Sequence, residues 1–213
     1  MLRDAYTFII PLLVLALICL LVGWWLAPGF YAGTVLLVLL AAFVGFFFRD
    51  PERAIPQGDG LVVSPADGRV MFVKPADPQD ERAGTLVSIF LSVFDVHINR
   101  SPIAGRITAV EYRAGKFLNA LNDRCSVENE QNIVRVENGQ LMVTCSQIAG
   151  VIARRIVFWH KAGDWVERGQ RIGLIKFGSR TDLILPPGVN VCVKPGDRVR
   201  GGVTTIGKVN RPF

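Results

Sequence analysis

SPADGRV, residues 64–70, decides the fold of this chain because the motif occurs twice. It returns as SPIAGRI at 101–107, and a second motif, GDWVERG at 163–169, returns as GDRVRGG at 196–202. Two turn motifs that each appear twice are typical of a pseudo-symmetric unit built from short strands. We therefore expect a mainly β domain with an internal repeat.

The residues between these turns strengthen the β prediction. Short apolar or alternating runs follow one another between Gly, Pro and Asn residues, and Asn138-Gly139 separates two of them, which is a strong β-hairpin signal. Both turn patterns resemble those of lipoyl/biotinyl-type domains, which implies a barrel-sandwich fold. Asp67 in the first copy corresponds to Ala104 in the second, so the turn geometry alone does not explain that carboxylate.

The N-terminal segment has a different composition. Residues 5–48 contain no charged side chain, and a Pro-Gly turn divides them into two apolar halves, each about long enough for a membrane-crossing helix. We predict an apolar helical hairpin over 1–48, a linker over 49–60 and a β-rich catalytic domain over 61–213.

Basic residues flank the hairpin. Arg3 precedes it, and Arg49 and Arg53 follow it, so the positive-inside rule places both ends, and the β domain, on the cytoplasmic face of the inner cell membrane. A hairpin that lies within one leaflet is the alternative.

Composition limits the classes of partner and of site. The formal net charge is +6, and all of it belongs to the chain after the hairpin, which favours an anionic membrane surface, and not nucleic acid, as the partner. The four cysteines form no C-x-x-C pair, and the two histidines are too few for a zinc site. We predict no metal and no disulfide framework.

Three polar residues in β contexts have the chemistry of a nucleophilic site. Ser179 would attack, His97 would take its proton, and Asp67 would orient His97, if the fold brings the three together. The nucleophile elbow G-x-S-x-G is absent, since the sequence around Ser179 is F-G-S-R-T. An α/β-hydrolase is therefore not supported.

Several motifs in fixed order carry a family resemblance. FFRDPERAIP, SPADGRV, FDVHINRSPIAG, ARRIV and GQRIGLIKFGSRTD closely resemble the short, archaeal-type form of phosphatidylserine decarboxylase, a pyruvoyl enzyme. The resemblance implies self-cleavage between Gly178 and Ser179, with His97 and Asp67 as the matching catalytic residues. Where long-form members have L-G-S-T and a further histidine, this chain has F-G-S-R and Phe94.

The resemblance also implies a reaction. Serinolysis would convert Ser179 into a covalent pyruvoyl cofactor, and the associated pieces 1–178 and 179–213 would convert phosphatidylserine into phosphatidylethanolamine and carbon dioxide. Arg180 and Arg155 are weaker candidates for contact with the lipid phosphate, because arginines on a strand are commonly solvated. The sequence is compatible with a monomer and with a homo-oligomer.

Two other functions are compatible with parts of the sequence. A membrane-anchored lipoyl/biotinyl-like binding or adaptor module would share the fold without catalysis, but a carrier domain needs a modifiable Lys at a hairpin tip. Lys176 instead lies within an apolar run. A zinc peptidase of the lysostaphin kind shares the GDWVERGQRIGLI turn but requires more histidine ligands than His97 and His160.

Overall fold

The structure, a computed structural model, describes residues 4–119, 122, 124–151, 155–175 and 179–209. It divides into two compact units, Met1–Glu52 and Arg53–Phe213. The helices are α1 (Asp4–Trp25), α2 (Phe30–Phe47) and α3 (Cys125–Glu128). The strands are β1 (Leu61–Val63), β2 (Gly68–Asp77), β3 (Asp80–Leu91), β4 (Ile98–Arg100), β5 (Gly105–Arg113), β6 (Gln131–Glu137), β7 (Met142–Ile148), β8 (Ile156–Phe158), β9 (Trp165–Val166), β10 (Arg171–Ile175), β11 (Ser179–Leu185), β12 (Val189–Val191), β13 (Arg198–Val199) and β14 (Thr205–Val209).

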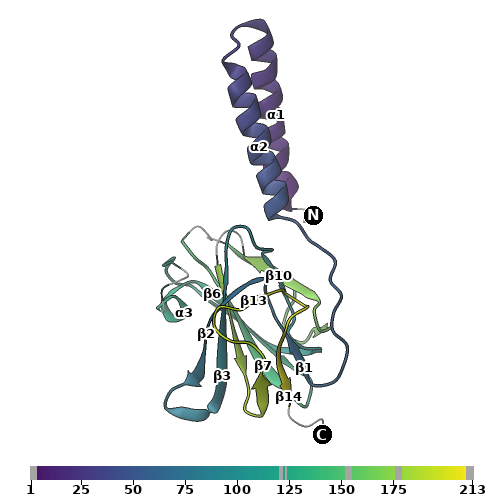
Figure 1. The fold of residues 1–213 in the computed structure, drawn as a ribbon, viewed down its shortest axis with the longest axis vertical. Helices are drawn as coiled ribbons and strands as arrows, with labels where there is room; N and C mark the ends of the chain where they lie inside the picture. The colour runs from purple at the N-terminus through teal and green to yellow at the C-terminus, as the bar shows by residue number, and fades with distance from the viewer. Residues whose placement is uncertain (1–3, 120–121, 123, 152–154, 176–178, 210–213) are drawn as a thin grey trace. The chain divides into compact units, whose positions relative to one another are not determined.

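The first unit is the predicted helical hairpin. α1 and α2 pack side by side along their length (Figure 1). The Thr34 hydroxyl lies 3.4 Å from the Ala16 carbonyl oxygen across the pair, and the rings of Phe8 and Phe48 stack near the open end. Both helices are long and apolar enough to cross a membrane. The expected apolar hairpin is therefore confirmed.

The second unit is mainly β, as predicted (Figure 1). Among the described residues, the largest sheet has the strand order β13-β2-β3-β11-β7-β6-β5-β9, and it curls around an apolar core. Two three-stranded sheets, β1-β14-β12 and β4-β10-β8, complete the unit. β11 lies between β3 and β7 and pairs antiparallel with both. The strand that begins at Ser179 is thus an interior strand of the large sheet.

The internal repeat is visible in the backbone hydrogen bonds. Val70 N–H donates to the Asp197 carbonyl, and Ile107 N–H donates to the Asp164 carbonyl at the same 2.8–2.9 Å. The serines match too, because the Ser64 carbonyl accepts from Gly202 and the Ser101 carbonyl accepts from Gly169. The two copies therefore form equivalent turn pairs, which confirms the pseudo-symmetric prediction.

The Asn138-Gly139 signal is also confirmed. β6 and β7 pair antiparallel up to Glu137 and Met142, and the loop between them contains Gly139 at φ +82°. The Asn138 side-chain oxygen accepts hydrogen bonds from the backbone N–H groups of Gln140 and Leu141, which closes the turn.

Candidate functional site

Ser179 is the first residue of β11 and is fully buried. It is the register partner of Leu91 in the antiparallel pair of β11 and β3. Its hydroxyl oxygen has no hydrogen-bond partner among the described residues. A buried hydroxyl without a partner is unfavourable by about 1–3 kcal/mol, and among the described residues Ser179 shares this condition with the Ser88 hydroxyl and Arg168 Nε.

His97 immediately precedes β4 and is also buried. Its carbonyl oxygen accepts a hydrogen bond from the N–H of Ile175, the last residue of β10. Its Nδ1 lies 2.9 Å from the Asp95 carbonyl oxygen. A carbonyl can only accept, so this contact places a ring proton on Nδ1; whenever the imidazole is neutral, Nε2 is its basic nitrogen.

Asp67 lies in the turn before β2. Its Oδ2 is 2.7 Å from Nη2 of Arg53, and its Oδ1 accepts from the N–H of Gly201 at 2.7 Å. Within the described residues no hydrogen bond joins its carboxylate to His97 or Ser179. Sequence reasoning missed Arg53 as a partner of this carboxylate, although the FFRDPERAIP motif contains it.

Asp67 and Ser179 lie at one end of the large sheet, and His97 immediately precedes a strand of a small sheet. Arg69 of β2 pairs with Phe90, and Ser179 pairs with the next residue, Leu91, so Asp67 and Ser179 lie where two strands flanking β3 begin. His97 is held beside Ile175, and only residues 176–178 separate Ile175 from Ser179. Gly178, the predicted partner in the cleaved bond, lies outside the described residues.

The candidate phosphate-binding arginines have different environments. Arg180 is fully buried and forms a two-point ion pair with Asp182, with Nε–Oδ1 and Nη2–Oδ2 distances of 2.8 and 3.1 Å. Its guanidinium also lies over the Phe72 ring. Arg155 is exposed just before β8. Phosphate contact stays a prediction for both.

Three further polar residues stabilise turns. Asp95 Oδ2 accepts from the N–H and hydroxyl of Ser92, which shapes the turn leading to His97. His160 lies 3.6 Å from Asp164 through Nδ1, within the GDWVERG turn region. Glu128 pairs with Lys116 at 2.8 Å, and this pairing lowers the pKa of the glutamate and raises that of the lysine.

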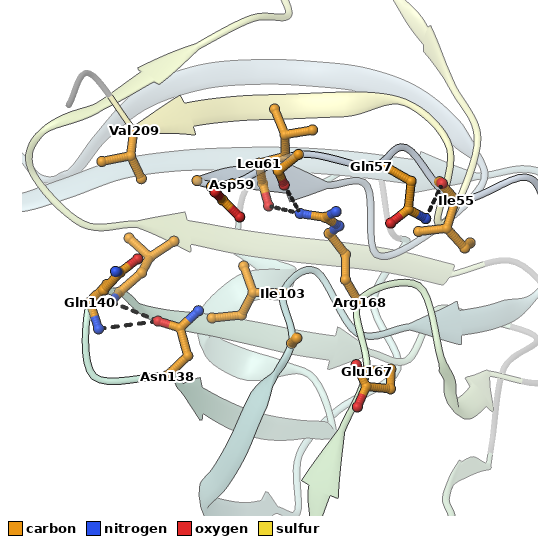
Figure 2. A pocket seen from close by; sticks show the side chains of 14 residues that line it. Ile55, Gln57, Asp59, Leu61, Ile103, Asn138, Gln140, Glu167, Arg168 and Val209 are labelled. Carbon is orange, nitrogen blue, oxygen red and sulfur yellow. Dashed lines mark hydrogen bonds between the residues drawn. The ribbon is translucent and has the colours of Figure 1, made fainter. Parts of the chain in front are cut away.

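A cavity of about 500 Å³ lies between residues 55–61, the 138–141 loop and the second copy of the repeat, and Ser179, His97 and Asp67 do not line it. Figure 2 shows Arg168 in this cavity, where its guanidinium donates to the carbonyl oxygens of Gly58 and Leu61. Ala104 lines it at the position that corresponds to Asp67. The cavity therefore contains the position that matches Asp67, and that position has no carboxylate.

The donor set fits a group made from the chain better than a metal ion. In the described part of the chain, no three His, Cys, Asp or Glu side chains gather as metal ligands would. The buried, unpartnered Ser179 hydroxyl at the start of β11 is compatible with a prosthetic group derived from that serine.

Comparison with known proteins agrees with this site. The family model for phosphatidylserine decarboxylase matches residues 40–207. A phosphatidylserine decarboxylase proenzyme of Symbiobacterium thermophilum is 51% identical over 97% of this chain and 94% of its own length. Proenzymes of the same name from Solibacter usitatus and Carboxydothermus hydrogenoformans are 50% and 43% identical, over 88% and 98% of this chain and 88% and 96% of their own lengths.

The family model and these relatives define the class of this protein as a carboxy-lyase. The chain belongs to the phosphatidylserine decarboxylase family.

Proposed function

We propose that this chain is a proenzyme that cuts itself between Gly178 and Ser179 and then decarboxylates phosphatidylserine to phosphatidylethanolamine. The observation that carries the proposal is the Ser179 hydroxyl, which is buried and has no partner among the described residues. The position of His97 beside Ile175, the last residue described before Ser179, supports it.

Self-cleavage begins with the pair Ser179 and His97. His97 Nε2 takes the hydroxyl proton, and Oγ attacks the carbonyl carbon of Gly178. The peptide C–N bond breaks, the Ser179 nitrogen takes up a proton, and an ester joins the two residues. Glycine suits the acyl side because it leaves the carbonyl open to attack.

Elimination then completes the cut. Loss of the Ser179 Cα proton expels the Gly178 carboxylate and leaves a dehydroalanine at position 179. Its tautomer adds water and releases ammonia, so the C-terminal piece begins with a pyruvoyl group. Water is the only co-reactant, and no electrons enter or leave.

The pyruvoyl group supplies an electrophilic carbonyl that holds the substrate amine and accepts the electron pair released with carbon dioxide. The chain's own residues provide the surroundings. Burial at the start of β11 excludes water, which favours loss of the charged carboxylate. His97 holds a proton for the product carbon. Asp67 is the proposed catalytic carboxylate, and exposed Arg155, with Arg180 as the weaker candidate, is proposed to meet the lipid phosphate.

The apolar hairpin is proposed to keep this site at its lipid substrate. α1 and α2 would anchor the chain in the inner cell membrane with the β unit on the cytoplasmic face, because Arg49 follows the second helix. A tag at the N-terminus should then resist protease added outside intact cells. Digestion of that tag from outside would overturn the cytoplasmic placement.

Intact mass measurement of the purified full chain tests the proposal. We expect two pieces, 1–178 and 179–213, with the second blocked by a pyruvoyl group at its N-terminus. Ser179→Ala should stay whole and lose all decarboxylase activity on phosphatidylserine vesicles. A wild-type chain that stays whole with a free Ser179 hydroxyl would refute the mechanism.

The base has its own test. General-base catalysis contributes about 10²–10⁴-fold, so His97→Ala should slow cutting by that factor. His160→Ala, which changes the other histidine, should leave cutting unchanged. Normal cutting in His97→Ala would remove His97 from the base role.

A further inference from the structure

A chain of buried amide side chains runs through the unit close to the proposed site. Asn132 Nδ2 donates to Gln147 Oε1 at 3.0 Å, and Gln147 Nε2 donates to Asn99 Oδ1 at 2.9 Å. Asn99 Nδ2 donates in turn to Thr181 Oγ1 at 3.1 Å. Asn99, Gln147 and Thr181 are fully buried and Asn132 is nearly so. The three bonds run in one direction, and Gln147 and Asn99 each accept on the oxygen and donate from the nitrogen.

This amide chain joins two sheets. Asn132, Gln147 and Thr181 belong to β6, β7 and β11 of the large sheet, whereas Asn99 belongs to β4 of a small sheet. Gly173 of β10 pairs with Asn99, and a Cβ at that glycine would lie 3.0 Å from Gln147 Nε2. The close approach of β10 therefore depends on a residue without a side chain.

The position of the amide chain relates it to the reacting residues. Asn99 follows His97 by two residues, and Thr181 follows Ser179 by two residues. Ser179 and Thr181 both lie on β11, where side chains two residues apart point to the same face, and His97 immediately precedes β4, which contains Asn99. The Asn99–Thr181 bond thus ties the strand that follows the proposed base to the strand that begins at the proposed nucleophile.

We propose that this bond is a positioning contact that sets the approach of His97 to Ser179 during self-cleavage. The proposal rests on the proposed function. Four buried polar side chains satisfy one another where apolar residues would pack as well, and a directional network fixes one arrangement of the two strands in a way that apolar contacts do not. Thr181, Asn99, Gln147 and Asn132 act through His97 and Ser179 and do not themselves react.

Thr181→Val is the sharpest test, because it removes the accepting oxygen and keeps the shape. A misplacement of about 1 Å can slow a reaction about 100-fold. We therefore expect cutting of the full chain, followed by intact mass after a pulse of synthesis in cells, to slow about 10- to 100-fold. Thr181→Ser should restore it. Thr144→Val makes the same change on β7 outside the amide chain and should cut at the wild-type rate.

Hydroxylamine separates positioning from a general loss of structure. It cleaves an ester, so it releases a chain that has completed the attack of Ser179 and has stalled before elimination. We expect no rescue of Thr181→Val, because the attack itself is slowed. A wild-type cutting rate in this variant, or full rescue by hydroxylamine, would overturn the proposal. Thermal unfolding in detergent should show that Thr181→Val is still folded, with a lower melting temperature than Thr144→Val because the buried Asn99 amide loses its acceptor.

Outcomes for this proposal and for the proposed function are distinct. If the wild-type chain stays whole, the function fails; if it is cut and Thr181→Val is cut equally fast, only the positioning role fails. Should Thr181→Val not fold, Asn132→Ala removes the first donor of the amide chain and should slow cutting by a smaller factor. A wild-type rate in Asn132→Ala would then reject the positioning role.

Discussion

Arg53 Nη2 lies 2.7 Å from Asp67 Oδ2, and both side chains are largely buried. Arg53 is the first residue of the β unit, so the chain enters this unit through a contact with the carboxylate proposed for the site. Gly201 N–H holds the other oxygen. The carboxylate is thus held in place by two donors that are far from it in sequence.

Arg53→Gln should therefore slow self-cleavage, because Asp67 loses its charged partner and is free to rotate. Arg69→Gln is the matched control, since Arg69 is an exposed arginine next to the same turn. Time-resolved mass measurement of newly made chains would show the difference. Equal cutting in both variants would mean that Arg53 only stabilises the fold or has no role.

Changing Asp182 alone should destabilise the fold far more than changing Asp182 and Arg180 together. Asp182→Asn leaves the fully buried Arg180 guanidinium without its counter-ion, and breaking such a pair costs about 3–5 kcal/mol. Arg180→Met with Asp182→Leu removes both charges and should recover most of that loss. Urea unfolding of the uncut Ser179→Ala chain in detergent measures both. Equal destabilisation by the single and double changes would contradict this account.

Cys145 should make the fold sensitive to alkali. Burial, helped by the nearby Asp182 carboxylate, raises the pKa of the Cys145 thiol from 9.0 to about 12. Below pH 9 both states keep the proton, so the contribution of this thiol to stability is constant. Between pH 9 and 12 only the unfolded state loses it, which lowers the unfolding free energy by about 1.4 kcal/mol per pH unit.

The Cys145 contribution is measured as a slope. Cys145→Ala should show a shallower loss of stability above pH 9 than the wild-type chain, whatever its stability at neutral pH. Cys192→Ala, at an exposed thiol, should keep the wild-type slope. A Cys145→Ala chain with an unchanged alkaline slope would disprove the prediction.

Gly68 should not tolerate a side chain. A Cβ there would lie 2.1 Å from the Phe90 carbonyl oxygen, so alanine must push β2 away from β3 at the level of Ser179. Gly68→Ala should lower the melting temperature strongly and impair cutting. Gly188→Ala also faces a positive φ, but it meets nothing within 4 Å, and should lower the melting temperature by only about 2–4 °C. Similar losses in the two variants would contradict the clash.

Local chemistry explains which parts of the fold were predictable. A contiguous stretch of sequence determines each of three features: the helical hairpin, the repeated turns and the Asn138-Gly139 hairpin. The structure confirms each of them. Hydrophobic length and turn residues act within a few positions of the chain, so one sequence suffices to infer them.

Long-range contacts explain what was not predictable in the site. The Asn99–Thr181 bond joins residues 82 positions apart, and the sequence of neither segment indicates that it contacts the other. The partner of His97 Nδ1 is a backbone carbonyl, that of Asp95, and every residue has one. Residue types identified Ser179, His97 and Asp67 as candidates, but the contacts that hold them can be identified only in the folded structure.

The interior position of β11 has a consequence for the mature protein. After a cut before Ser179, the short piece would still supply β11 between β3 and β7, β13 beside β2 and β14 beside β1. The two pieces would contribute neighbouring strands to the same sheets with no covalent link between them. Once unfolded, they would have to find each other by diffusion, so assembly would depend on concentration. Only the uncut chain would fold as a single molecule. After the cut, the lifetime of the active protein would be set by its unfolding rate.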